Sequence, residues 1–312
     1  MLTIHPPGPL DAATWIDLYD PTPDEVAEVE TATGITVPDR AALSEIETSS
    51  RLRFHDKTVY LSTPVLSRGE TPDAALSPMG LVLSAKRLVT VRFAQLRAVD
   101  AAIAEAARIS DQSSVCAFVV LLEALVDRAA DLLEAAGAEL DGLSHRIFRI
   151  DVQDARKIPK GNTRLRMILS EVGQLGDRLS KIRGSLLGVG RVVPFASEVA
   201  RDWISPEFQA RLGAVRADVL SLADYETHLD GKNQFLLDAV LGFISTEQND
   251  LFKILTIVSV VGVPPTLIAS LYGMNFAIIP ELHWRYGYPY ALAMIVLSAV
   301  IPMGWFKWKG WW

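Results

Sequence analysis

The segment Tyr272-Gly273-Met274-Asn275-Phe276 stands between two apolar stretches near the C-terminal end of the sequence. The first stretch runs from Leu251 to Leu271, with one early charge at Lys253, and the second runs from Tyr288 to Phe306. As helices that rise roughly 1.5 Å per residue, both are about long enough to cross the ~30 Å hydrocarbon layer of a membrane. Helices of soluble cores usually keep a polar face, so two buried soluble helices are the less favoured alternative. The sequence therefore predicts two membrane-spanning helices joined by a short loop.

Composition predicts that most of the chain lies outside the membrane. Hydrophobic residues make up 50% of the sequence and charged residues 21%, which is too polar for a bundle of many spans. Residues 251–312 hold four basic residues and one acidic residue, a net charge of +3, so residues 1–250 carry −10 of the total −7. This acidic balance disfavours nucleic acid as a partner, because phosphate binding requires a basic patch. It is compatible with divalent cations as partners, or simply with solubility.

The charges that flank the two apolar stretches predict their orientation. Lys307 and Lys309 follow the second stretch and Lys253 begins the first, whereas the loop of residues 273–287 holds one arginine and one glutamate. By the positive-inside rule, both termini face the cytoplasm and the loop faces outward. Met1–Asp11 has neither the basic flank nor the apolar core of a secretory signal. We therefore expect a multi-pass protein of the cell (inner) membrane whose large soluble region is cytoplasmic.

The soluble region divides where its hydrophobic period changes. Residues 1–110 mix β-rich runs with a helical pattern, which predicts an α/β domain. The β-rich runs are Thr14–Tyr19, Thr58–Leu66, Leu81–Leu83 and Leu88–Phe93, and the helical pattern is Asp24–Thr33. Residues 111–195 predict a helical hairpin, with helices over Ser113–Ile150 and Asn162–Val189, a break at Ile158–Gly161 and a further interruption at Arg191–Pro194.

Residues 196–250 predict the cytoplasmic part of a long stalk helix. Pro206 lies near its start and no proline follows until Pro264, so we expect roughly sixty helical residues that continue into the first span, residues 251–272. Apolar residues follow an alternating three-four spacing, which is typical of a coiled-coil-like seam. The seam comprises Leu212, Val215, Val219, Leu222, Leu229, Leu236, Val240 and Phe243, with polar Glu226 and Asn233 at two intermediate positions.

A second stripe, offset from the seam by about 200° at 100° per residue, is small and polar. It comprises Asp238, Gly242, Ser245 and Asn249, leads into Phe252 and Thr256, and is followed within the span by Ser259, Thr266 and Ser270. On an ordinary helix such a stripe is a solvated face. Because lipid offers polar groups no hydrogen-bond partners, its continuation into a span favours a pore lining instead. One chain with two spans cannot enclose a pathway, so several copies would have to form a closed ring.

The segment Tyr272–Phe276 resembles the signature of the CorA family of divalent-cation transporters, which is Gly-Met-Asn at the end of the first transmembrane helix. The resemblance continues through Pro280-Glu281-Leu282, Trp284, Gly287-Tyr288-Pro289 and the basic, aromatic tail Phe306–Trp312. It implies an α+β membrane protein assembled as a homopentameric funnel, with the span 251–272 lining the pore. The loop 273–287 would be extracytoplasmic, the span 288–306 would lie outside the first, and residues 307–312 would form a cytoplasmic tail.

The resemblance also implies a selectivity filter made of Gly273, Met274 and Asn275, supported by Tyr272 and Phe276. Mg²⁺ holds its waters tightly, so a hydrated ion passes more easily than a bare one. Asn275 amides and Gly273 carbonyls would offer neutral acceptors to those waters, and Glu281 in the outer loop would attract cations. Gly273 would permit a backbone turn that a Cβ atom obstructs. A helix C-cap and turn is the plain structural interpretation of the same glycine.

Further site residues follow from the same resemblance. It implies polar rings at Asp238 and Asn249 and a hydrophobic gate at Phe252 and Leu255, with packing against lipid or protein as the alternative role of Phe252. The polar stripe itself adds expected rings at Ser245, Thr256 and Thr266. Members of the family sense cytoplasmic Mg²⁺ through acidic residues between subunits, for which Asp218 and Asp224 are candidates here. The tail holds two lysines where relatives often have a longer basic run, so it departs from the family pattern.

These observations predict a channel that moves Mg²⁺, with Co²⁺ or Ni²⁺ as further ions, and that closes when cytoplasmic Mg²⁺ binds between subunits. A ZntB-like zinc transporter, with proton coupling as a further question, is the nearest alternative. A membrane-tethered cytoplasmic enzyme or scaffold is a distant one. The sequence has no Gly-rich phosphate loop with a lysine, no His-Glu-x-x-His and no Gly-x-Ser-x-Gly. With one cysteine, Cys116, and five scattered histidines, we expect neither enzymatic activity nor a cofactor, and Mg²⁺ only as substrate and regulatory ligand.

Overall fold

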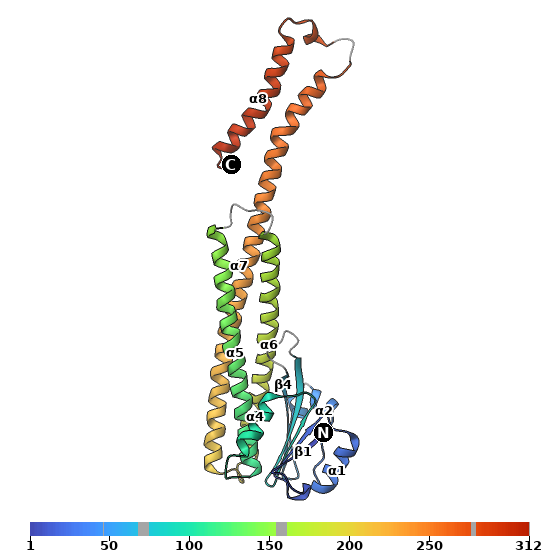
Figure 1. The fold of residues 1–312 in the computed structure, drawn as a ribbon, viewed down its shortest axis with the longest axis vertical. Helices are drawn as coiled ribbons and strands as arrows, with labels where there is room; N and C mark the ends of the chain where they lie inside the picture. Colours follow the sequence, from blue (N-terminus) through green and yellow to red (C-terminus); the bar gives the residue numbers. More distant parts are fainter. Residues whose placement is uncertain (46, 68–74, 154–160, 276–278, 312) are drawn as a thin grey trace. The chain divides into compact units, whose positions relative to one another are not determined.

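The structure is a computed structural model that describes residues 1–45, 47–67, 75–153, 161–275 and 279–311. The chain forms two compact units, one of residues 1–158 and 166–238 and the other of residues 159–165 and 239–312. The first unit contains a sheet and three long helices, and the second contains the end of the longest helix followed by a shorter one (Figure 1).

A mixed sheet of six strands forms the N-terminal part of the first unit. Among the described residues, its spatial order is β1-β2-β6-β5-β4-β3, and only the pair β2–β6 is parallel. The strands are β1 (Leu2–His5), β2 (Trp15–Tyr19), β3 (Leu52–His55), β4 (Thr58–Ser67), β5 (Ala75–Ser84) and β6 (Leu88–Arg92). The predicted α/β domain is therefore present, although β5 is longer than expected and the sequence did not reveal β1 and β3.

Helices cover both faces of the sheet, because alternate side chains of each strand point to opposite sides. On one face, Ile16 and Val89 pack in a core with Val29 of α1 (Pro23–Thr33) and Leu43 of α2 (Arg40–Ser44). On the other face, Trp15 of β2 and the buried side chains of β4, β5 and β6 pack against the helices α4, α5, α6 and α7. Those helices are α4 (Arg97–Ala106), α5 (Ser114–Gln153), α6 (Gly161–Val199) and α7 (Pro206–Tyr272). The last helix of the chain is α8 (Gly287–Trp308). The remaining short helical elements are η1 (Leu10–Ala12), α3 (Thr48–Arg51) and η2 (Pro280–His283).

The helices α6 and α7 pass through prolines, and the interruption predicted at Arg191–Pro194 is absent from the described part of α6. α6 does not stop at Arg191–Pro194 but continues through Pro194 to Val199. A proline removes one helical hydrogen bond, and that loss is tolerated here because Val192, Val193 and Ala196 are buried in the core beside the sheet. α7 contains 67 residues and passes through Pro264 and Pro265, so it is somewhat longer than predicted.

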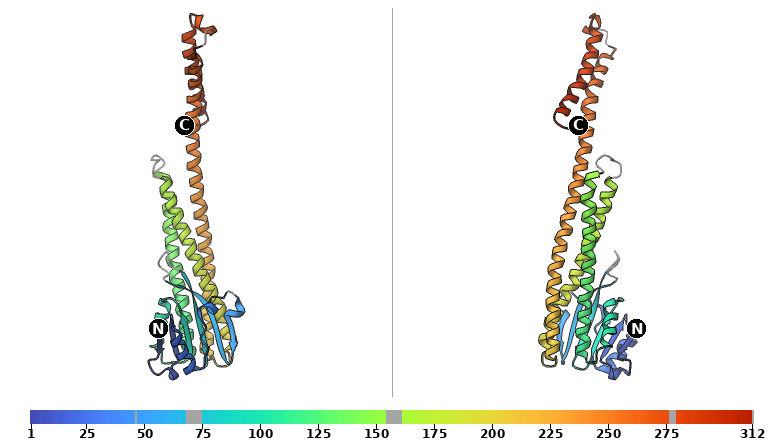
Figure 2. Two further views of the ribbon diagram at one scale, coloured as in Figure 1. Left: turned by 90° about the vertical axis from the view of Figure 1, so that its right-hand side faces the viewer. Right: turned by 60° about the vertical axis from the view of Figure 1, so that its left-hand side comes forward.

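Most of the predicted seam of α7 is buried, and Leu222 and Phe243 are half-buried. α5, α6 and the first part of α7 run side by side in the first unit (Figures 1 and 2). The polar positions are buried as well, with Glu226 1% and Asn233 8% exposed. The guanidinium of Arg183 on α6 lies 3.3 Å from the Glu226 carboxylate. The Asn233 amide occupies a notch at Gly176, where a Cβ atom would lie 2.7 Å from its Nδ2. These polar groups fix the register of α7 against α6.

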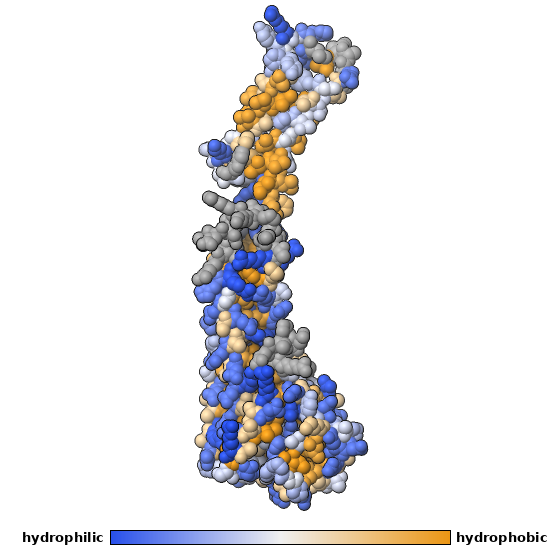
Figure 3. All heavy atoms as spheres, in the orientation of Figure 1, coloured by the Kyte–Doolittle hydropathy of each residue, from blue (hydrophilic) through white to orange (hydrophobic). Residues whose placement is uncertain are grey.

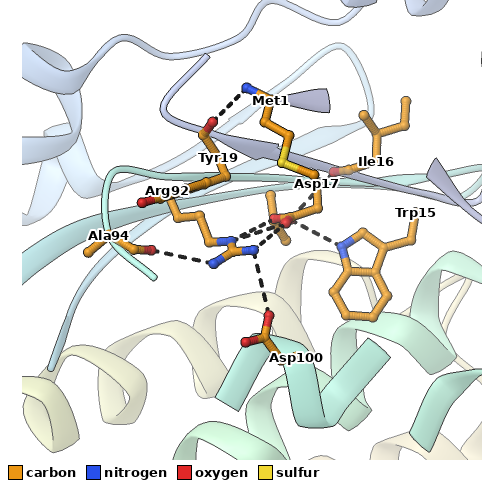
Figure 4. Close-up of polar contacts among 9 residues, drawn as sticks. Met1, Trp15, Ile16, Asp17, Tyr19, Arg92, Ala94 and Asp100 are labelled. Carbon is orange, nitrogen blue, oxygen red and sulfur yellow. Dashed lines mark hydrogen bonds and ion pairs between the residues drawn. The ribbon is translucent and has the colours of Figure 1, made fainter. Parts of the chain in front are cut away.

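A buried ion pair joins the parallel strands β2 and β6 on the face of the sheet that packs against α4 and the long helices (Figure 4). The guanidinium of Arg92 donates two hydrogen bonds, of 2.9 and 3.0 Å, to Oδ2 of Asp17. The Thr90 hydroxyl donates to Oδ1 of Asp17 at 2.6 Å, and it accepts a hydrogen bond from the indole of Trp15. The partly exposed carboxylate of Asp100 on α4 lies 3.8 Å from the Arg92 guanidinium. The network therefore ties the two parallel strands together and connects them to α4.

We expect Arg92→Ala to lower the free energy of unfolding by about 3–5 kcal/mol, because it leaves the Asp17 carboxylate buried without its counterion. Asp100→Ala is the matched control, since this carboxylate is 52% exposed and makes only the longer contact. Its effect should stay within about 1 kcal/mol. Chemical denaturation of the full-length protein in detergent measures both, and equal losses would contradict this account of the pair.

Glu226 generates a prediction about pH. Burial raises the pKa of Glu226, against the opposing effect of the Arg183 guanidinium and with a further increase from Asp230. Because the pKa of Glu226 is higher in the folded than in the unfolded protein, folding favours the protonated carboxyl group. The resulting stabilisation of the folded state is fully present below the ordinary pKa of 4.5 and is lost as pH rises through the folded pKa. Relative to wild type, Glu226→Gln should therefore gain thermal stability as the pH increases toward neutrality. The control Asp230→Asn, at an exposed neighbouring residue, should not show this gain in thermal stability. If the melting temperatures of Glu226→Gln and wild type change with pH in parallel, the prediction is refuted.

Candidate functional site

Two helices of the second unit are apolar and long enough to span a membrane. The apolar window of α7 is 0% buried and that of α8 is 6% buried. A core helix of a soluble protein would bury these side chains, yet Phe252 is 66%, Val263 62% and Ile301 64% exposed. Figure 3 shows hydrophobic residues gathered over the last part of α7 and over α8. Exposure of this extent agrees with the two predicted spans and disfavours the soluble-core alternative.

α7 ends directly before the segment expected to act as a filter. The amide of Gly273 still donates to the Ala269 carbonyl at 3.0 Å, and the amide of Met274 donates to Leu271 at 3.3 Å. Gly273, Met274 and Asn275 are all exposed. Phe276, the second expected supporting residue, lies outside the described residues.

Gly273 lies in the turn that follows α7, where the sequence predicts that a Cβ atom would be obstructed. Its backbone is not left-handed, which distinguishes it from Gly34 and Gly310. A Cβ atom at this position would lie 3.2 Å from the Ala269 carbonyl oxygen. Glycine is therefore favoured by the close approach of the preceding helical turn and not by an unusual φ.

The loop before α8 is closed by a glycine whose role the sequence analysis missed. The amide of Trp284 donates to the Glu281 carbonyl at 3.2 Å, and the amide of Gly287 donates to the Trp284 carbonyl at 2.9 Å. Gly287 is buried, and a Cβ atom there would lie 2.2 Å from the carbonyl oxygen of Glu281. No side chain fits at this position, so Gly287 fixes the backbone at half-buried Glu281. The only sequence signal was the glycine in Gly287-Tyr288-Pro289.

The polar stripe of α7 lies on an exposed side of the helix. Each of its members is exposed in the single chain: Asp238, Gly242, Ser245, Asn249, Phe252, Thr256, Ser259, Thr266 and Ser270. The spacing of three and four residues leads on to exposed Gly273. The expected gate residues Phe252 and Leu255 are 66% and 61% exposed, one turn beyond Asn249. One chain thus aligns these residues along a helix without enclosing a pathway.

Two threonines of the stripe satisfy their hydroxyl donors within α7. Thr256 donates to the Phe252 carbonyl and Thr266 to the Gly262 carbonyl, both at 2.8 Å. The premise that such groups lack partners in lipid is therefore wrong for these hydroxyl donors, because a helix can supply the acceptor. The exposed side-chain amides of Asn249 and Asn275 are therefore stronger evidence for a polar pathway than the two threonines.

The candidate sensor residues Asp218 and Asp224 are exposed on α7 in the first unit. Asp218 lies close enough to Asp127 of α5 to influence its ionisation. Burial and then the neighbouring carboxylates Glu123, Asp131 and Asp218 raise the pKa of Asp127. Among the described residues, no three His, Cys, Asp or Glu side chains are grouped so as to hold a metal ion. A sensing role for Asp218 and Asp224 stays a prediction.

Comparison with known proteins covers almost the whole chain. Residues 11–308 match the family described as CorA-like Mg²⁺ transporter protein. The chain is 32% identical over 307 residues to the magnesium transport protein CorA of Haemophilus ducreyi, covering 98% of this chain and 94% of that protein. It is also 32% identical over 312 residues to magnesium transport protein CorA of Escherichia coli, covering 99% of this chain and 95% of the relative.

The solved structures agree at the level of fold. The complete structure of the CorA magnesium transporter from Methanocaldococcus jannaschii superimposes with a TM-score of 0.74 at 20% identity, over 96% of this chain and 91% of that one. The full-length CmaX protein gives a TM-score of 0.63 at 17% identity, over 95% of this chain and 88% of that one. With its family match and its full-length relatives, the chain belongs to the family of CorA-like Mg²⁺ transporter proteins.

Proposed function

We propose that this protein is a channel that moves Mg²⁺ across the cell membrane through a ring of Gly273-Met274-Asn275 segments. The observation that carries the proposal is the continuity of α7, which extends from the first unit through an apolar span and ends at this segment. Its exposed stripe places small polar side chains along one line toward Asn275. The names of the H. ducreyi and E. coli relatives, both magnesium transport proteins, support Mg²⁺ as the substrate.

The assembly is a closed ring of identical chains, and a homopentamer is the order that the resemblance to CorA implies. One chain supplies a single helix with an exposed polar stripe, so a pathway requires one such helix from each copy. α7 lines the pore and α8 lies between it and lipid. Both termini face the cytoplasm, since Lys253, Lys307 and Lys309 flank the spans on one side.

Selectivity arises from neutral acceptors that bind the waters of the ion. Stripping Mg²⁺ of its waters is costly, so the Asn275 amide oxygen and the nearby carbonyls bind a hydrated ion. The C-terminal end of each α7 adds roughly half a negative elementary charge beside the filter. Glu281, whose backbone is fixed by Gly287, increases the local concentration of cations at the outer mouth. No carboxylate needs to ligate the ion in the filter itself, so the ion can leave.

The gate lies at Phe252 and Leu255, where apolar side chains from each copy close the pore by excluding water. Polar rings lie on either side of this gate along α7, formed by Asp238, Ser245, Asn249, Thr256 and Thr266. Cytoplasmic Mg²⁺ bound by acidic residues of adjacent chains, with Asp218 and Asp224 as candidates, favours the closed ring. The exposure of the stripe and of both gate residues in the single chain supports this arrangement.

We expect Asn275→Ala to lower Mg²⁺ flux into proteoliposomes by about tenfold or more, because a hydrogen bond to a charged partner contributes about 1.5–3 kcal/mol. Flux should not require a proton gradient. Gln248→Ala is the matched control, since it removes another exposed amide from α7 outside the stripe. Wild-type flux in Asn275→Ala would contradict the filter. Zn²⁺ uptake that rises with a proton gradient, without Mg²⁺ flux, would favour the ZntB-like alternative.

The gate generates a second prediction. Phe252→Ala should raise Mg²⁺ flux severalfold when Mg²⁺ is present on the cytoplasmic side, because a smaller apolar ring is harder to dewet. Ile254→Ala provides the control, since Ile254 is 51% exposed on a different side of α7. Single-channel or flux recordings at high and low cytoplasmic Mg²⁺ test both variants. Equal effects of the two substitutions would indicate that Phe252 packs against lipid or protein and does not form the gate.

A further inference from the structure

The C-terminal end of α8 is capped by a folded turn and does not simply fray. The amide of Gly310 donates to the Lys307 carbonyl at 3.1 Å, and the amide of Trp311 donates to Phe306 at 3.0 Å. Gly310 has a φ of +71°, a left-handed conformation that glycine adopts without strain. This hydrogen-bond pair and the left-handed glycine form a Schellman motif. The motif turns the last described residue, Trp311, back toward the helix.

Aromatic contacts hold this turn together. The ring of Trp311 stacks on Phe306 at 5.4 Å with an interplanar angle of 29°, and Trp305 contacts the same phenyl ring edge-on at 5.2 Å. Phe306 is only 2% exposed as a result. An apolar contact between these two positions commonly accompanies a Schellman motif. Residues 305–311 are therefore a compact element, which we name the aromatic cap.

The aromatic cap combines exposed indoles with two lysines. Trp308 is 82% exposed, Trp305 49% and Trp311 41%. The ammonium of Lys309 lies 6.0 Å from the ring centroid of Trp305, and Lys307 lies in the last turn of α8. Residues 282–312 contain no aspartate or glutamate.

We propose that the aromatic cap binds anionic phospholipid at the membrane surface where α8 ends. Indole rings prefer the boundary between headgroups and acyl chains, and lysines beside them attract phosphate-bearing headgroups. The folded turn holds the Trp311 ring against Phe306 and the Lys309 ammonium beside Trp305, so a lipid binds here without first ordering a flexible tail. The lipid fixes the depth at which α8 sits in the membrane. This inference requires the membrane span but does not depend on which ion is transported.

The test titrates the full-length protein in detergent with phosphatidylglycerol or phosphatidylcholine and counts bound lipids by native mass spectrometry. Wild type should prefer phosphatidylglycerol, and the double variant Lys307→Gln/Lys309→Gln should lose about twentyfold of that preference, at about fivefold for each lysine near an anionic surface. Equal binding of the two lipids by wild type, or full preference in the double variant, would overturn the proposal. Displacement of the lipid by glycerol phosphate at similar concentration would also overturn it, because the site would then be specific for soluble phosphate.

A pair of glycine variants tests whether the folded turn matters. Both Gly310 and Gly304 have space for a Cβ atom, but only Gly310 has a left-handed backbone. Gly310→Ala should weaken phosphatidylglycerol binding severalfold, whereas Gly304→Ala should leave it unchanged. If both variants bind like wild type while the lysine variant does not, a flexible basic tail explains binding and the aromatic cap is refuted. Thermal unfolding without added lipid shows that each variant is folded.

Discussion

The rest of the structure depends on the requirement that α7 remain one helix in two different solvents. Over 67 residues it passes from a water-exposed bundle into a segment with the composition of a membrane span. In lipid, every backbone amide and carbonyl must find its partner inside the helix, so the chain cannot break there without a large cost. Within the first unit, the seam sets the angular position of α7, because its buried residues pack in the core with α5 and α6.

The polar groups within the seam make that angular position specific. An entirely apolar seam tolerates sliding and rotation, because one aliphatic side chain replaces another at little cost. A shift of α7 would move the Glu226 carboxylate away from the Arg183 guanidinium and would take Asn233 out of the notch at Gly176, where its side chain fits. The two polar residues define one register of α7 on α6.

Long repeating patterns in the sequence predicted the structure well, and single-residue contacts did not. The seam, the two spans and the helix α5 rest on many residues that all favour the same period, so local exceptions do not change the result. The strands β1 and β3 contain four residues each, too few for a period to stand out. Pro194 was misleading because the burial of its neighbours outweighs the loss of one hydrogen bond. The roles of Gly287 and Gly310 depend on atoms brought close by folding, which composition does not reveal.

The neutrality of the Gly273–Asn275 segment is consistent with the distribution of charge along the chain. Residues 1–250 carry a net charge of −10, whereas the membrane part and its tail carry +3, so the acidic residues are concentrated away from the proposed filter. A ring of carboxylates in a narrow pore would hold a divalent cation strongly and slow its release. Amide and carbonyl oxygens bind the waters of the ion more weakly, and the C-terminal ends of the α7 helices supply a permanent but fractional negative potential. Conduction requires this balance, because an ion that is attracted to the pore must also be able to leave it.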